Sequence, residues 1–203
     1  MKKTFAIGAM LLGIASVPAK ATELGLLVDQ EIGRSETLAA PGGSGLPAGG
    51  YDRANPTGYG IRAAYTFLNL HVAEFGAAVT YHPKAQDDLI QGGINRGKLG
   101  DQYWALGVQA DWKLLMDLHA GLDMRSEKVT TSAVNGTSDS TTFVRPWIKA
   151  GVGYIVPTPV VSPFVRVEVA VPLTSYDSSA STDDFRKAMA PSLQVALYGG
   201  IRF

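Results

Sequence analysis

The stretch that decides the fold is the last one in the chain, SLQVALYGGIRF, which runs from Ser192 to Phe203. One set of alternate positions is apolar: Leu193, Val195, Leu197, Ile201 and Phe203. The other set is small or polar: Ser192, Gln194, Ala196, Tyr198 and Arg202. Successive side chains of a β-strand point to opposite faces, so this period of two predicts a strand with one apolar and one polar face. The chain ends on this strand and on an aromatic side chain.

Seven other stretches alternate in the same way. Together with the last stretch, the predicted strands are Glu23–Arg34, Thr57–Phe67, Leu70–His82, Asp101–Lys113, Asp117–Glu127, Thr142–Val156, Ser162–Leu173 and Pro191–Phe203. Each is long enough to cross a bilayer when tilted, which takes about 9–11 residues. The predicted fold class is therefore all-β, an eight-stranded antiparallel up-and-down transmembrane β-barrel.

The connections between these strands alternate in length. The long ones are Ser35–Pro56, Pro83–Gly100, Val129–Thr141 and Thr174–Ala190, and the tight ones are Leu68–Asn69, Leu114–Met116 and Pro157–Val161. Transmembrane barrels have short periplasmic turns and longer external loops, which is the same alternation. An even number of strands also returns both chain ends to the periplasmic side. Within the last long loop, Asp183–Met189 could form a helical turn.

A soluble lipocalin-type barrel also has eight strands, but it encloses its apolar face. Two features favour the inverted, membrane arrangement. Aromatic residues lie near both ends of the apolar faces, as Tyr59 and Phe67 do, and Trp104 and Trp112. Glycines crowd the polar face, where the narrow interior of an eight-stranded barrel admits long charged side chains only beside small neighbours.

The N-terminus predicts export. Lys2 and Lys3 form a positive start, Phe5–Val17 is uncharged and mostly apolar, and Ala19-Lys20-Ala21 fits a signal-peptidase site. The apolar run is too short for a membrane anchor, which needs about 20 residues. We therefore expect a cleaved signal peptide over residues 1–21 and one barrel domain over residues 22–203.

Composition excludes several classes of function. Without the three lysines of the signal segment, 15 basic residues stand against 18 acidic ones, so no basic patch for nucleic acid is expected. The chain has no cysteine, which excludes disulfides and cysteine-based metal sites.

On these features, the mature chain resembles the small eight-stranded outer-membrane barrels of the OmpA-like and OmpX-like porin family. The resemblance rests on the signal peptide, the eight strands, the loop asymmetry and the terminal Phe203, so it implies a fold and not one activity. It implies residence in the outer membrane of a Gram-negative cell, contact with lipid and lipopolysaccharide, and recognition of Phe203 by the barrel-assembly machinery. The chain stops at the eighth strand, so the periplasmic peptidoglycan-binding domain of full-length OmpA-type proteins is not expected.

The predicted interior carries balanced charge. Fourteen charged side chains are assigned to it: Asp29, Glu31, Arg62, Glu74, Asp111, Lys113, Asp123, Arg125, Glu127, Arg145, Lys149, Arg166, Glu168 and Arg202. Buried charges are tolerated when they are paired, so this balance predicts an interlocked ion-pair network that fills the barrel. The alternative is a narrow path for small ions or solutes.

Some small outer-membrane barrels modify lipids, so the three histidines are candidate catalysts. His82 and His119 are assigned to the inward face and His71 to the outward face, and none has a serine placed for a Ser-His-acid arrangement. We expect no catalytic residue, no cofactor and no metal site. Acidic pairs in the loops, such as Asp87-Asp88 and Asp183-Asp184, lack the spacing of a dedicated calcium site.

The sequence thus predicts a monomeric, non-enzymatic outer-membrane scaffold for surface interaction, with four external loops that bind an unknown ligand. A narrow channel and a lipid-modifying enzyme are the alternatives.

Overall fold

The computed structural model describes residues 22–33, 38–40, 46–52, 54–70, 72–114, 116–176 and 181–203. The predicted signal peptide and His71 lie outside the described residues.

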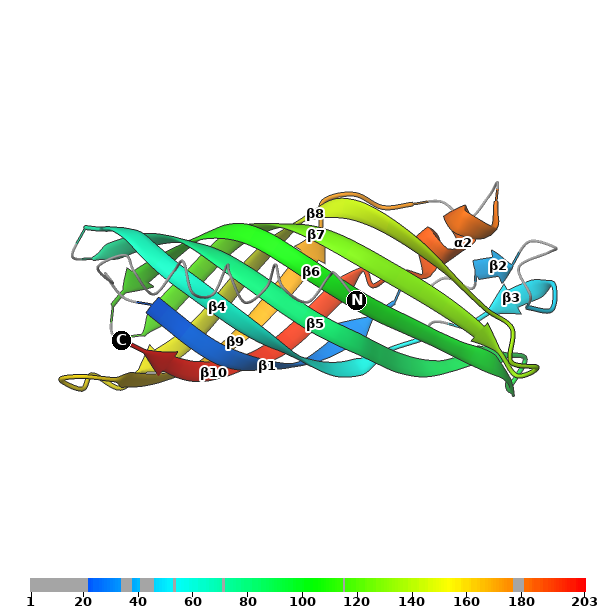
Figure 1. Cartoon of the computed structure of the whole chain (residues 1–203), viewed down its shortest axis with the longest axis horizontal. Helices are drawn as coiled ribbons and strands as arrows, with labels where there is room; N and C mark the ends of the chain where they lie inside the picture. Colours follow the sequence, from blue (N-terminus) through cyan, green and yellow to red (C-terminus); the bar gives the residue numbers. More distant parts are fainter. Residues whose placement is uncertain are drawn as a thin grey trace, which may run out of the picture.

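Eight long antiparallel strands close into one barrel (Figure 1). They are β1 (Thr22–Ile32), β4 (Thr57–Asn69), β5 (Ala73–Gln91), β6 (Ile94–Lys113), β7 (Asp117–Ala133), β8 (Ser138–Ile155), β9 (Ser162–Pro172) and β10 (Leu193–Arg202). Neighbours in sequence are neighbours in the ring, and β10 closes it by pairing with β1, where Glu23 faces Arg202 and Val28 faces Leu197. The predicted eight-stranded antiparallel barrel is confirmed.

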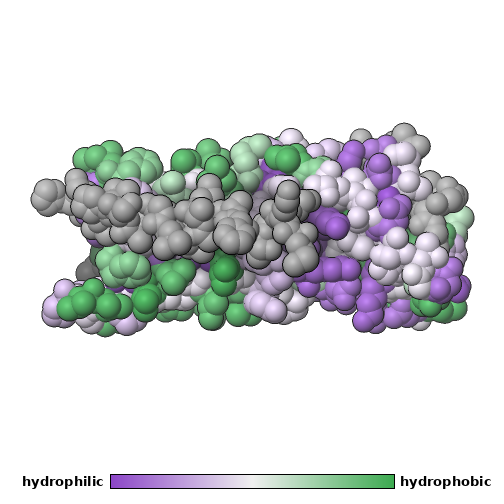
Figure 2. All heavy atoms as spheres, in the orientation of Figure 1, coloured by the Kyte–Doolittle hydropathy of each residue, from purple (hydrophilic) through white to green (hydrophobic). Residues whose placement is uncertain are grey.

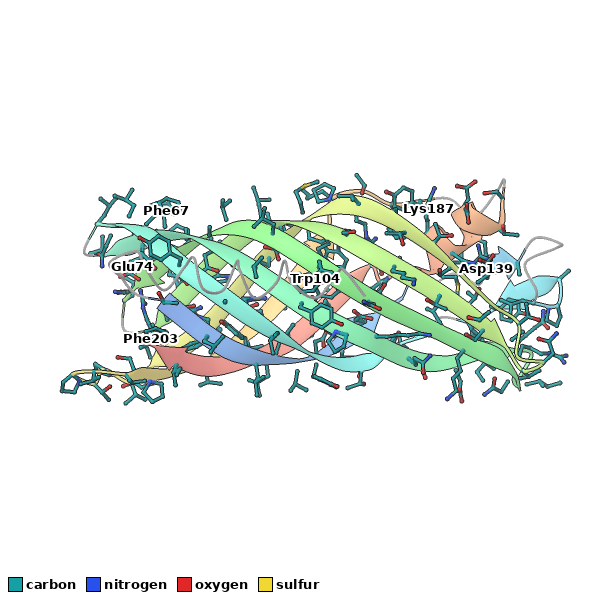
Figure 3. All side chains as sticks on the ribbon, in the orientation of Figure 1. Phe67, Glu74, Trp104, Asp139, Lys187 and Phe203 are labelled. Atoms are coloured by element: carbon teal, nitrogen blue, oxygen red, sulfur yellow. The ribbon has the colours of Figure 1, made fainter. Side chains whose placement is uncertain are left out.

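The apolar faces of the strands point outward, as predicted. Leu106 is 64% exposed and Val167 is 49% exposed, whereas the alternate positions are mostly buried. Large exposed apolar side chains cover the half of the barrel that contains Phe67 and Phe203 and extend on β6 as far as Trp104 (Figures 2 and 3). Beyond Trp104 the surface is mostly hydrophilic, apart from Ile94 and Val134 at the hairpin tips.

Two of the predicted loops are in fact strands. β5 and β6 continue through Pro83–Gly100 to a turn at Gly92 and Gly93, and β7 and β8 continue through most of Val129–Thr141. Pro83 suggested a strand end, but it lies at a break in register between His82 and Ala85, where a residue without an amide proton is tolerated. His82 is therefore in the middle of its strand and not near its end.

A small second core covers the hydrophilic end of the barrel. The hairpin of β2 (Leu38–Ala40) and β3 (Gly49–Tyr51) packs with helix α2 (Thr182–Met189) over the inner sides of β5, β6 and β7. We call this the cap; its buried core consists of Leu38, Ala40, Leu46, Tyr51, Ala54, Leu89, Leu99, Val129, Phe185, Ala188, Met189 and Ala190. Ser181 caps α2 by accepting a hydrogen bond from the Asp184 amide, as expected of an N-cap serine. The predicted helical turn is confirmed.

Among the described residues, no helix has the length and apolar character needed to cross a membrane.

Candidate functional site in the barrel interior

The polar faces of the eight strands meet inside the barrel. Of the fourteen charged side chains assigned to the interior, all except Lys113 are buried. Lys113 lies at the end of β6, where its side chain is 37% exposed and its ammonium group contacts the buried carboxylate of Glu74. The charged interior side chains form three groups of contacts along the barrel axis.

The central group joins opposite walls of the barrel. Arg62 Nη1 on β4 lies 2.7 Å from both carboxylate oxygens of Glu168 on β9, and these strands are not neighbours in the ring. Lys149 Nζ donates to Asp123 Oδ1 at 2.9 Å. His119 Nε2 lies 3.8 Å from Glu168 Oε1. Side chains from facing walls therefore fill the bore at this level.

The second group lies toward the end that carries Phe203, and its centre is Arg166. Its Nη1 and Nη2 donate to the Glu23 carboxylate at 3.0 Å, Nη2 lies 3.1 Å from Asp111 Oδ1, and Nε donates to Asp117. Arg202 contacts Glu74 close by. One guanidinium thus holds three carboxylates, which satisfies its fork of donors.

Sequence reasoning missed Glu23 and Asp117 in this group, and Asp101 further along the barrel. All three are buried, and each has the same parity as the inward residues of its own strand. Extending the alternation to the first residue of each predicted strand would have found them.

The third group lies between the central group and the cap. Arg145 Nε donates to both oxygens of Glu127, at 2.9 and 2.8 Å, and Arg125 lies between the rings of Tyr103 and Trp147, 4.5 and 4.0 Å from their centroids. On the opposite side, His82 Nε2 lies 2.9 Å from Asp29 Oδ1. Glu31 and Asp101 are buried beside this pair.

Glycines make room for these long side chains. A Cβ atom added at Gly107 would lie 2.0 Å from Asp123 Oδ1, and one at Gly121 would lie 2.6 Å from Lys149 Cε. Both contacts are shorter than real carbon atoms allow, so the Lys149–Asp123 pair depends on glycine at both positions.

Within the described chain, the hydrogen-bond partners of the two buried imidazoles are carboxylates, Asp29 for His82 and Asp111 for His119. A serine hydroxyl is not among these partners, so the geometry gives neither histidine the arrangement of a nucleophilic triad.

The cap is attached to the barrel wall by a buried arginine, Arg186, that sequence reasoning did not identify. Arg186 on α2 donates from Nη1 to Asp183 at 3.0 Å and from Nε to Thr131 at 3.2 Å, and it also contacts Asp139 on β8. Thr141 Oγ1 donates to Asp183 Oδ1 at 2.6 Å. This hydrogen bond, with the nearby Arg186 charge, lowers the pKa of Asp183 below its usual 3.8. Only the docking of α2 brings Arg186 to the wall, so strand alternation carries no signal for it.

No protein-family model and no curated protein sequence matches this chain. Among solved structures, the chain is similar to Ail, the attachment invasion locus protein of Yersinia pestis, with 14% identity and a TM-score of 0.50 over 91% of this chain and 99% of that chain. Ail in complex with the heparin analogue sucrose octasulfate aligns with 15% identity and a TM-score of 0.48, over 90% of this chain and 98% of that one. Neisserial surface protein A aligns with 10% identity and a TM-score of 0.49, over 90% of this chain and 95% of that one. The likeness to Ail extends over nearly all of both chains and supports the fold alone.

Proposed function

We propose that this protein is a Gram-negative outer-membrane barrel whose membrane-embedded half anchors an outer half that projects from the cell and serves in surface interaction. The observation that carries the proposal is the outward apolar band, which stops near Trp104 although the strands continue (Figures 2 and 3). A soluble protein would not leave so many large apolar side chains in water.

Strand lengths agree with this division. β5, β6, β7 and β8 have 19, 20, 17 and 18 residues, well above the 9–11 or so that a tilted strand needs to cross a bilayer. At ~3.3 Å per residue and a tilt of ~40°, twenty residues extend roughly 50 Å, about twice the ~25 Å lipid band. The remaining half, with the cap, would stand outside the membrane.

In this arrangement Phe203 and the tight turns lie on the periplasmic side. The proposal therefore includes a signal peptide over residues 1–21, Phe203 as part of the signal read by the barrel-assembly machinery, and lipid and lipopolysaccharide as neighbours. The ligand of the external surface is proposed to bind the outer hairpins and cap of a single chain.

A filled interior favours a scaffold over a channel. The ion pairs of Arg62 with Glu168 and of Arg166 with Glu23 join strands that are not neighbours in the ring, and the cap packs over the outer end. Opening a path would separate buried charges, which is costly.

Two measurements on the refolded protein test these statements. Flotation with phospholipid vesicles tests the membrane assignment: the chain should float with the vesicles, and a folded chain that stays in the aqueous phase without detergent would contradict it. Planar-bilayer recordings test the scaffold assignment: we expect no reproducible conductance, and a stable unitary conductance would favour the narrow channel instead.

A further inference from the structure

The third interior group contains more negative than positive charge. Four carboxyl groups gather there, Asp29, Glu31, Asp101 and Glu127, and the guanidinium groups that face them belong to Arg125 and Arg145. Acidic side chains therefore outnumber basic ones in this group. The central group is balanced, because Arg62 pairs with Glu168 and Lys149 pairs with Asp123.

Three of these side chains converge on one point. One ligand atom each from Asp29, Glu31 and His82 lies within 4.8 Å of the other two, and all three side chains are buried. Three atoms at the corners of a triangle with edges of 4.8 Å lie about 2.8 Å from its centre, compared with zinc–ligand bonds of ~2.1 Å. Closure around an ion thus needs side-chain movement of less than about 1 Å.

Three buried side-chain atoms in this group are free to bind a ligand. Glu31 Oε2 and Asp101 Oδ1 have no hydrogen-bond partner in the part of the chain that the structure describes, and neither has His82 Nδ1. Glu31 and Asp101 also face each other, carboxyl to carboxyl. Two carboxyl groups in contact require either a shared proton or a cation between them.

The surroundings hold the three side chains in place. The ring of His82 stacks on Tyr103 with 4.9 Å between centroids and 1° between planes. Gln194 donates to the second oxygen of Asp29. Gly58, opposite Asp29 in the sheet, leaves the space that the imidazole occupies. A carboxylate that an outer partner orients by a hydrogen bond, as Gln194 orients Asp29, is typical of metal sites.

From this convergence we propose that Asp29, Glu31 and His82, with Asp101 beside them, bind one divalent transition-metal ion such as Zn²⁺ inside the outer half of the barrel. One imidazole with two or three carboxylates is a donor set that suits Zn²⁺, and the nitrogen ligand distinguishes it from an all-oxygen calcium site. The ion would add positive charge where four carboxyl groups face two guanidinium groups. It would connect β1 to β5 and brace the barrel just below the cap. The sequence did not predict this site, because its ligands come from strands whose register is set by pairing.

The test uses the untagged chain, refolded in detergent after removal of metal with a chelator, and titrated with Zn²⁺ by calorimetry and with Co²⁺ by visible absorption. We expect one ion per chain. Glu31→Gln and His82→Gln should weaken binding at least tenfold. The matched control is His119→Gln. His119 also forms a buried pair with a carboxylate, Asp111, at 2.8 Å, but this carboxylate already has a cationic partner in Arg166. It should bind within about twofold of wild type.

X-ray absorption of the zinc-loaded wild-type chain needs no variant, so it remains decisive if His82→Gln does not fold. It should show a single imidazole with the other ligands oxygen. No stoichiometric Zn²⁺ uptake by the folded wild-type chain would overturn the proposal and assign a shared proton to Glu31 and Asp101. Equal losses in His82→Gln and His119→Gln, or undiminished binding by Glu31→Gln, would also overturn it.

Discussion

Arg62 on β4 and Glu168 on β9 form a salt bridge of 2.7 Å across the bore, although 106 residues separate them in sequence. Both side chains are only 3% exposed. β4 and β9 are separated in the ring by β1 and β10, so the pair joins walls that share no backbone hydrogen bond. This buried ion pair therefore contributes directly to the stability of the closed barrel.

Glu168→Ala should destabilise the barrel by about 3–5 kcal/mol, because it leaves the Arg62 guanidinium buried without its partner. Urea unfolding in lipid vesicles measures the loss. Asp88→Ala is the control, since Asp88 is exposed opposite Lys98 and its removal should cost less than about 0.5 kcal/mol. Replacing both members of the buried pair, as Arg62→Met with Glu168→Leu, should recover most of the loss. Equal stability of Glu168→Ala and wild type would show that the pair does not hold the walls together.

Val167→Arg should impair membrane insertion by about 2–4 kcal/mol, because Val167 is outward in the middle of the apolar band. The loss is measured as the fraction of chains that assemble in vesicles, detected by the heat-dependent shift in gel mobility of folded barrels. Gln86→Arg places the same charge at an exposed position of the outer half of β5 and should assemble like wild type. If both variants assembled equally well, the assignment of the lipid-facing half would be wrong.

Deletion of Phe203 should slow assembly in cells more than it weakens the folded barrel. Its backbone exchanges two hydrogen bonds with Thr22, at 2.7 and 3.0 Å, each of which contributes about 1 kcal/mol. The effect on urea unfolding should therefore be small, whereas surface levels measured by protease accessibility should fall clearly. Unchanged surface levels would remove the proposed signal role.

Gly58→Ala should displace His82, because an added Cβ would lie 2.4 Å from His82 Nε2 and 3.0 Å from Ala85 Cβ. Overpacking of this kind costs about 1–3 kcal/mol. Gly199→Ala is a control in the same barrel: its nearest atom would be Phe164 O at 3.5 Å, an ordinary contact. Thermal unfolding should separate the two variants, and an equally stable Gly58→Ala would show that the imidazole can move aside.

The cap should loosen in acid before the barrel unfolds. Thr141 and Arg186 lower the pKa of Asp183, so the Asp183 contribution is present above its ordinary value of 3.8 and is lost as the pH falls through the lowered value. Pepsin, which is active in acid, reports the loosening of the wild-type cap by cleaving at Phe185, and trypsin reports loosening at neutral pH by cleaving at Arg186; both residues are buried when α2 is docked. Asp183→Asn should be loose already at neutral pH and show no further change in acid. Cleavage that is independent of both pH and substitution would exclude this role.

Alternation was sufficient for much of the architecture. It predicted eight strands, their outward faces and the inward position of Arg62, Lys149 and Glu168, because side-chain direction in a strand depends only on residue parity. Alternation was insufficient at Pro83, where the proline suggested a strand end but pairing with β6 continues the strand on both sides of it. Alternation also could not place Arg186, which reaches the barrel wall only because Phe185 and its neighbours pack α2 into the core of the cap.

The sequence by itself therefore determined which side chains enter the barrel and which face outward. Only the tertiary structure decided which inward side chains meet: Arg62 with Glu168 across the bore, and Asp29 and Glu31 with His82 beneath the cap. The physical reason is that the period of two is a local property of each strand. Contact across a barrel depends on the register of every strand pair between the two residues, and no single strand contains that information.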